Sequence, residues 1–131
     1  MANERILIVE DNEKSRRLVR DVLRFKGYET VETETAEEGL RVAREARPAL
    51  ILMDIQLPGM NGIDALGCLR ADPATRDIPV IAVTASAMTQ DRKQILAAGF
   101  DAYQPKPITV KAFLDAIRQT LDRDRRDASE S

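Results

Sequence analysis

The sequence predicts an α/β protein with a doubly wound, five-stranded parallel sheet and five helices. Two observations predict this class. Short apolar runs alternate five times with longer segments of helical period, and right-handed crossovers between parallel strands place helices on both faces of a sheet. The chain has 131 residues, 44% of them hydrophobic and 32% charged, so it can bury a core without disulfides or a structural metal.

Five runs have the composition of strands. They are ILIV at residues 6–9, the half-buried alternation YETVET from Tyr28, ALILM from Ala49, PVIAV from Pro79 and FDAYQ from Phe100. The first, third and fourth runs are apolar on both faces, so these strands should lie in the centre of the sheet. The flavodoxin-like strand order 2-1-3-4-5 fits this pattern as a template.

Capping and stop signals delimit the helices between these strands. The first helix ends at Gly27 and carries an apolar stripe of Leu18, Val22 and Phe25, with Val19 and Leu23 beside it. The second helix opens with the capping box of Thr35 and Glu38 and stops at Pro48, and the third is capped by Asn61 and stops at Pro73. The fourth helix covers 87–98 and stops at Gly99. The fifth starts at Thr109, and its apolar residues are Phe113, Leu114, Ile117 and Leu121.

The end of the chain, DRDRRDASES, is polar, mixed in charge and almost free of apolar residues. Such a segment has nothing to pack against a core, so we expect it to fray or to be disordered. The predicted organisation is one domain over residues 1–122 and a polar tail over 123–131.

Composition excludes several kinds of chemistry. The chain has no histidine, which removes histidine-based catalysis and imidazole metal ligands, and its single cysteine, Cys68, can form no internal disulfide. A net charge of -2 provides no basic field for nucleic acid, and no apolar run approaches the roughly 20 residues that span a bilayer. The acids near the N-terminus do not fit a signal peptide. We therefore expect a cytoplasmic protein that binds neither nucleic acid nor membrane.

Polar residues follow the strands, at the sheet edge where parallel α/β proteins place their sites. Glu10 and Asp11 follow the first strand, Asp54 the third, Thr84 the fourth and Lys106 the fifth. The first and third strands are predicted neighbours, so the three carboxylates would repel one another unless a cation neutralised them. All-oxygen ligation selects a hard ion, typically Mg²⁺. Acids that merely end a strand in a solvated loop would explain one acid but explain three acids and a lysine poorly.

The other groups at this edge indicate phosphoryl transfer, which needs a nucleophile, a cation and donors around the phosphoryl oxygens. Asp54 can be the nucleophile, because carboxylates form aspartyl-phosphates. Lys106 and the Thr84 hydroxyl can bind phosphoryl oxygens. Each alone could be a surface lysine or a strand-end residue, and their placement on separate strand ends favours the functional interpretation.

Four motifs contain these residues: VEDN with Glu10 and Asp11, LMDIQLPGMNG with Asp54, VTA with Thr84, and YQPKP with Tyr103 and Lys106. With them, the sequence resembles the receiver domain of two-component response regulators over about residues 5–121. The stretches VEDNEKSRRL and DIPVIAVTASAM look most like the single-domain cell-division regulators and the receivers of hybrid kinases.

The resemblance implies a phosphorelay in which Asp54 accepts phosphate from a histidine kinase or a histidine phosphotransfer protein. Asp11, Asp54 and the backbone carbonyl of Gln56 would ligate Mg²⁺, with Glu10 acting through water. The Lys106-Pro107 peptide bond would be cis. No catalysis beyond self-phosphorylation and self-dephosphorylation is expected, so the protein would be a signalling module and not an enzyme.

The resemblance also implies how phosphorylation would change the surface that a partner recognises. The Thr84 hydroxyl would move to the phosphate and Tyr103 would rotate inward, although Tyr103 by itself could be a half-buried packing aromatic. The affected face consists of the fourth helix, the fifth strand and the fifth helix, where a downstream protein partner could dock. It includes Ala87, Met88, Ala102 and Lys111.

Four other functions fit the sequence less well. A Mg²⁺-dependent phosphatase of the aspartate-nucleophile type is the main one, but the family it resembles has a second acid two residues beyond the nucleophile, where this chain has Gln56. A flavin-binding module shares the fold, but Glu10 and Asp11 would repel a phosphate after the first strand. An NTPase needs a G-x-x-x-x-G-K-[ST] loop, which is absent. Little of this sequence follows Leu121, so we expect no DNA-binding output module within it, although its polar end could also be a linker to a further domain.

Overall fold

The computed structural model describes the backbone of residues 4–85 and 89–130. Five parallel strands form one sheet in the order β2-β1-β3-β4-β5. The strands are β1 (Arg5–Val9), β2 (Glu29–Thr33), β3 (Leu50–Asp54), β4 (Val80–Thr84) and β5 (Ala102–Pro105). The helices are α1 (Glu13–Phe25), α2 (Ala36–Ala46), α3 (Gly62–Ala71), α4 (Thr89–Ala97) and α5 (Val110–Glu130). The predicted fold class and strand order are confirmed.

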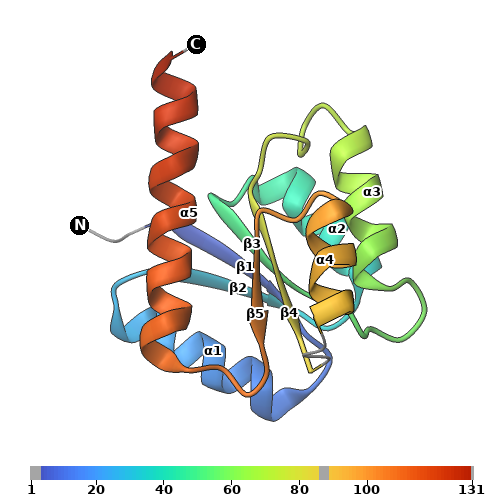
Figure 1. Cartoon of the computed structure of the whole chain (residues 1–131), viewed down its shortest axis with the longest axis vertical. Coiled ribbons are helices and arrows are strands. Elements are labelled where there is room, and N and C mark those ends of the chain that lie inside the picture. The colour runs from blue at the N-terminus through green and yellow to red at the C-terminus, as the bar shows by residue number, and fades with distance from the viewer. Residues whose placement is uncertain (1–3, 86–88, 131) are drawn as a thin grey trace.

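The sheet separates two cores, one on each face (Figure 1). Leu7 and Val9 of β1 face one core and Ile6 and Ile8 face the other, because side chains alternate along a strand. Helices α2, α3 and α4 cover the first face, and α1 and α5 cover the second. Every residue of β3 and β4 is buried, as expected for central strands.

The predicted caps of α2 and α3 are present, and α1 has a cap that was not predicted. Thr35 and Asn61 accept hydrogen bonds from the third backbone N–H that follows each of them, and Asn12 does the same for α1. Helix α2 ends at Arg47 in the left-handed conformation, with φ of 45°, directly before Pro48. Helix α4 is described from Thr89, so the predicted start at position 87 lies outside the described residues.

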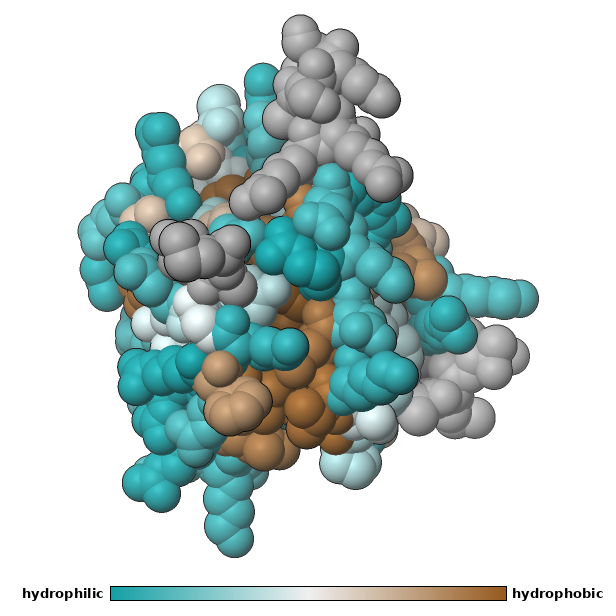
Figure 2. Space-filling model, turned by 90° about the vertical axis from the view of Figure 1, so that its left-hand side faces the viewer, coloured by the Kyte–Doolittle hydropathy of each residue, from teal (hydrophilic) through white to brown (hydrophobic). Residues whose placement is uncertain are grey.

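The predicted apolar stripe of α1 is wrong for Leu18 and Phe25, whereas its third member, Val22, packs partly buried against the core. Val19 and Leu23 are buried against the sheet, whereas Leu18 is exposed and Phe25 is 89% exposed. The predicted row of Leu18, Val22 and Phe25 and the row of Val19 and Leu23 lie side by side on the helix. Both have the helical period, so periodicity alone could not show which row faces the sheet. Figure 2 shows a hydrophobic patch on the side of the molecule that carries α1 and α5.

Helix α5 extends beyond the sheet (Figure 1) and continues to Glu130. The backbone is therefore helical through most of the segment 123–131 that the sequence predicts to be disordered. The last described α5 side chain in the buried core is Leu121. The division into a domain over 1–122 and a separate tail stays a prediction. None of the helices described here has the length and apolar composition required to cross a bilayer.

Candidate functional site

The carboxyl edges of β1 and β3 bring the predicted acids together. Val9 of β1 pairs with Met53 of β3, so the residues that follow, Glu10 and Asp54, lie side by side. Carboxylate oxygens of Glu10, Asp11 and Asp54 all lie within 4.8 Å of one another. Chain direction and strand register alone place these acids, which is why the sequence could predict the cluster.

The three acids differ in their access to water. Glu10 is 5% and Asp54 is 4% exposed, whereas Asp11 is exposed at the rim. Buried carboxylates are costly unless they are paired, hydrogen-bonded or bound to a metal. These three residues form an acidic pocket in which two carboxylates are buried and one is exposed.

Lys106 provides positive charge inside this pocket. Its ammonium group donates hydrogen bonds to the carboxylate of Glu10 and, at 3.1 Å, to Oδ2 of Asp54. The Lys106 backbone N–H donates to the carbonyl of Thr84 at 2.8 Å, which anchors the end of β5 beside β4. The Lys106-Pro107 peptide bond is cis, as the sequence resemblance implied.

Electrostatics in the pocket follow from burial and crowding. Burial, together with the neighbouring Asp54 carboxyl group, raises the pKa of Glu10 to about 7, although the Lys106 ammonium opposes the shift. Burial by itself would lower the pKa of Lys106, but the Glu10 and Asp54 carboxylates outweigh it, so that pKa is raised. The lysine is a fixed cation, and Glu10 titrates near neutral pH.

The loop after β3 fixes the orientation of Asp54. The backbone N–H of Gln56 donates to Oδ1 of Asp54 at 3.0 Å, while the lysine holds Oδ2. Gly62 permits close packing here, because a Cβ atom at this position would lie 2.6 Å from the Asp54 backbone oxygen. The Gln56 side chain is exposed, so its backbone is the part of the residue that is tied to the site.

Thr84 and Tyr103 lie on adjoining strands beside the pocket. Thr84 ends β4 and is buried. Tyr103, on β5 opposite Ala82, is half-buried and packs against the core beneath α2, α3 and α4. The packing role of this ring is therefore present in the structure. Its inward rotation stays a prediction.

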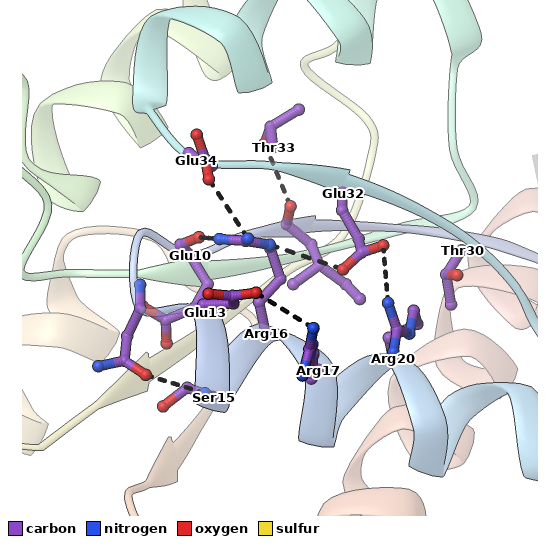
Figure 3. A network of polar contacts seen from close by, with 12 residues as sticks. Glu10, Glu13, Ser15, Arg16, Arg17, Arg20, Thr30, Glu32, Thr33 and Glu34 are labelled. Atoms are coloured by element: carbon purple, nitrogen blue, oxygen red, sulfur yellow. Dashed lines mark hydrogen bonds and ion pairs between the residues drawn. The ribbon is translucent and has the colours of Figure 1, made fainter.

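Sequence reasoning missed Arg16, which approaches the site from α1. Its Nη1 atom donates to the backbone carbonyl of Glu10 at 3.0 Å (Figure 3). Arg16 lies in a run of charged residues of the kind that is usually solvated, so no motif distinguished it. A possible signal was the pair Glu32 and Glu34 at the end of the second strand, which could pair with a cation on the first helix.

The donor set fits a hard divalent cation. Three carboxylates supply oxygen atoms within a span that one ion can bridge, and a chain without histidine offers no imidazole nitrogen to select a transition metal. Asp11 is exposed, so water can reach this cluster, as a cation such as Mg²⁺ that retains several water ligands requires. The residues present therefore fit the group that the sequence predicts.

A doubly wound parallel sheet with acids at the ends of β1 and β3 and a lysine at the end of β5 is the arrangement expected of a receiver-type signalling module. The sequence profile of the response regulator receiver domain matches residues 6–118. This chain belongs to that family, whose members act in two-component signalling and interact with histidine kinases or phosphotransfer proteins.

A relative in sequence is the polar-differentiation response regulator DivK of Brucella anthropi. It is 48% identical over 116 residues, which are 88% of this chain and 94% of that protein. DivK of Brucella ovis is 47% identical over the same length. These relatives confirm that the protein is similar to response regulators, the family in which the sequence analysis placed its resemblance.

Solved receiver structures have the same fold. A CheY-like receiver from Methanospirillum hungatei is 32% identical with a TM-score of 0.86, covering 96% of this chain and 99% of that one. The receiver domain of the sensor kinase PA1611 from Pseudomonas aeruginosa is 32% identical with a TM-score of 0.85, covering 92% and 99%. That structure has a magnesium ion coordinated in its active site cleft.

Proposed function

We propose that Asp54 is the phosphoacceptor of this receiver and that Mg²⁺ is the cation of its pocket. The observation that carries the proposal is the position of the Lys106 ammonium, in contact with both Asp54 and Glu10 at the edge where three acids meet. Among these acids Asp54 alone lies within a central strand, at its end, and donors hold both of its carboxylate oxygens in place. Glu10, whose two oxygens are also held by donors, lies outside the strand.

Asp11, Asp54 and the backbone carbonyl of Gln56 would hold Mg²⁺, with Glu10 acting through water. A cation held there would supply positive charge that offsets the charge on the transferring phosphoryl oxygens. The PA1611 receiver, with magnesium in its cleft, supports this assignment by similarity. The raised pKa of Glu10 supports it as well, because crowding and burial make its carboxylate costly without a cation.

The chain's own groups orient the transfer. The Gln56 N–H and the Lys106 ammonium fix the Asp54 carboxylate, which reduces the freedom it must lose before attack. One of its oxygens forms a bond to phosphorus while the bond from phosphorus to the imidazole nitrogen of the donor breaks, and that nitrogen keeps the electron pair. Lys106 then pairs with a phosphoryl oxygen, and the Thr84 hydroxyl donates to another.

A phosphatase of the aspartate-nucleophile type is not favoured. Such an enzyme needs an acid two residues beyond the nucleophile to act on the leaving group, and this chain has the uncharged, exposed side chain of Gln56 there. The proposed role is therefore that of a signalling module whose only chemistry is the gain and loss of its own phosphate.

The output surface belongs to the same proposal. It comprises α4, β5 and α5, with half-buried Ala102 and exposed Lys111 among its described residues. Ala87 and Met88, also predicted there, lie outside the described residues. Tyr103 is on β5, next to the strand that ends in Thr84, and packs against the core beneath α2, α3 and α4, which supports a link between phosphate and this surface. A cytoplasmic location, predicted from composition, accompanies the proposal.

Incubation of the protein with a small-molecule phosphodonor and Mg²⁺ tests the assignment. Intact-mass analysis should show the addition of one phosphate. The Asp54→Asn variant should gain none, while Asp64→Asn, which changes an acid in the first turn of α3, should behave as the parent. Labelling that persists in Asp54→Asn would place the acceptor elsewhere.

A further inference from the structure

The Arg16 side chain is largely withdrawn from water although it is charged. Its side chain is 14% exposed, and its three nitrogen atoms face three different partners (Figure 3). Nη1 donates to the Glu10 backbone carbonyl at 3.0 Å, Nε lies 3.6 Å from a Glu32 carboxylate oxygen, and Nη2 lies 3.3 Å from Glu34. A planar guanidinium can serve three such partners at once, which an ammonium does less well.

The carbonyl that Arg16 binds belongs to the short connection that carries two of the three acids. Only Glu10, Asp11 and Asn12 join β1 to α1. The Glu10 N–H donates to the Thr33 carbonyl at 3.0 Å, so β2 holds one backbone group of Glu10 and Arg16 holds the other. The Asn12 N–H donates to Glu10 Oε2 at 3.2 Å, which fixes the far end of the connection.

The two glutamates fix the direction of the guanidinium. Glu32 lies on β2 and Glu34 directly follows it, so both act on Arg16 from outside α1. Arg20, one turn further along α1, also lies near Glu32, at 3.7 Å, but its hydrogen bond goes to Asp21 and not to the connection. A charge-assisted bond to a backbone carbonyl is about twice as strong as a neutral one.

We propose that Arg16 is a positioning residue for the cation site: by holding the Glu10 carbonyl it keeps Asp11 and Glu10 in register with Asp54. The proposal rests on the proposed function, because it assumes that these acids bind Mg²⁺. Arg16 touches no reacting atom, and it acts through the backbone that presents the acids. Residues of this kind, which orient metal ligands, typically change metal affinity by about 10- to 100-fold when they are removed.

Calorimetric titration of MgCl₂ into the full chain tests the proposal. Arg16→Ala should raise the Kd for Mg²⁺ about tenfold. Two matched arginines on the same helix serve as controls: Arg20→Ala removes a cation that shares Glu32, and Arg17→Ala removes one paired with Glu13 at 3.3 Å. Both controls should keep the parent Kd. Arg16→Met, which retains much of the apolar stem, should show the same loss and provides the test if the alanine variant does not fold.

A second readout needs no metal. In Mg²⁺-free buffer, the Asn12 amide, which is protected by its bond to Glu10 Oε2, should exchange with solvent faster in Arg16→Ala than in Arg20→Ala. A parent chain that binds no Mg²⁺ would overturn the proposed cation site together with this inference. A parent that binds Mg²⁺, with Arg16 variants of equal Kd and unchanged Asn12 exchange, would overturn the role of Arg16 alone.

Discussion

Lys106 donates hydrogen bonds to both Glu10 and Asp54, residues that lie 96 and 52 positions earlier in the chain. The three side chains come from the ends of β1, β3 and β5, so their meeting depends on the whole sheet. The ammonium group lies where a phosphoryl group on Asp54 would need a counter-charge. In the unphosphorylated protein it stabilises two buried carboxylates instead.

Loss of this ammonium should therefore destabilise the metal-free fold. We expect Lys106→Met to lower the free energy of unfolding by about 1–3 kcal/mol at pH 7, because two buried acids lose their partner. Urea denaturation without Mg²⁺ measures this. Lys111→Met, which changes an exposed lysine of α5, is the control and should have little effect. Equal stability of the two variants would contradict a stabilising role for the Lys106 contacts.

The raised pKa of Glu10 predicts a particular pH dependence. Between its ordinary value of 4.5 and about 7, the folded protein binds a proton at Glu10 that the unfolded chain has released. The contribution of Glu10 to stability should therefore decrease as pH rises through this window in Mg²⁺-free buffer. Urea midpoints of the parent and of Glu10→Gln, measured from pH 4.5 to 7.5, should diverge across it, with the parent losing more stability. Parallel curves would show that Glu10 titrates normally.

Binding of Mg²⁺ should stabilise the fold by mass action. At a free concentration ten times the Kd, the gain is about 1.4 kcal/mol. We expect the melting temperature of the parent to rise with MgCl₂ but not with NaCl of equal ionic strength. Asp11→Ala removes the exposed acid of the pocket and should abolish the rise. An indifferent melting temperature in the parent at tens of millimolar MgCl₂ would count against the site.

The polar tail should contribute little to the fold. Arg123 still contacts the body, donating to the Asp101 carbonyl at 3.2 Å, and among the α5 side chains that the structure describes the last one in the core is Leu121. Removal of residues 124–131 should change the free energy of unfolding by less than about 0.5 kcal/mol. Thermal denaturation of the truncated chain checks this. A larger loss would mean that the tail is part of the domain, contrary to the predicted boundary.

The sequence predicted the parts of the molecule that chain direction and burial determine. Apolar strands that end in acids specify where Glu10 and Asp54 must meet, because parallel strands share their carboxyl edge. The buried row of α1 could not be predicted, since two adjacent rows have the same period. The contact of Arg16 with the Glu10 carbonyl depends on how α1 lies over β2, which is a property of tertiary packing that no local pattern encodes.

Phosphorylation of Asp54 should switch the conformation of Thr84 and Tyr103. Phosphate on Asp54 adds charge and acceptor oxygens beside Thr84, whose hydroxyl can donate to them. If Thr84 moves, the half-buried ring of Tyr103 on the next strand can turn into the space it leaves. A phosphate can shift this equilibrium only by its differential affinity for the two states, so the unphosphorylated form should already visit the active state at low population.

Backbone amide shifts with and without a non-covalent phosphate mimic, in the presence of Mg²⁺, measure this switch. The parent should show changes at Asp54 and Lys106, and also at Tyr103 and Ile95, which report on β5 and α4. Thr84→Ala should keep the changes at Asp54 and lose most of those at Tyr103, because it removes only the hydroxyl donor. Asp54→Asn controls for binding of the mimic elsewhere. Changes confined to the acidic pocket of the parent, with β5 and α4 unaffected, would rule out the switch and leave the phosphoacceptor site standing, since the two depend on different contacts.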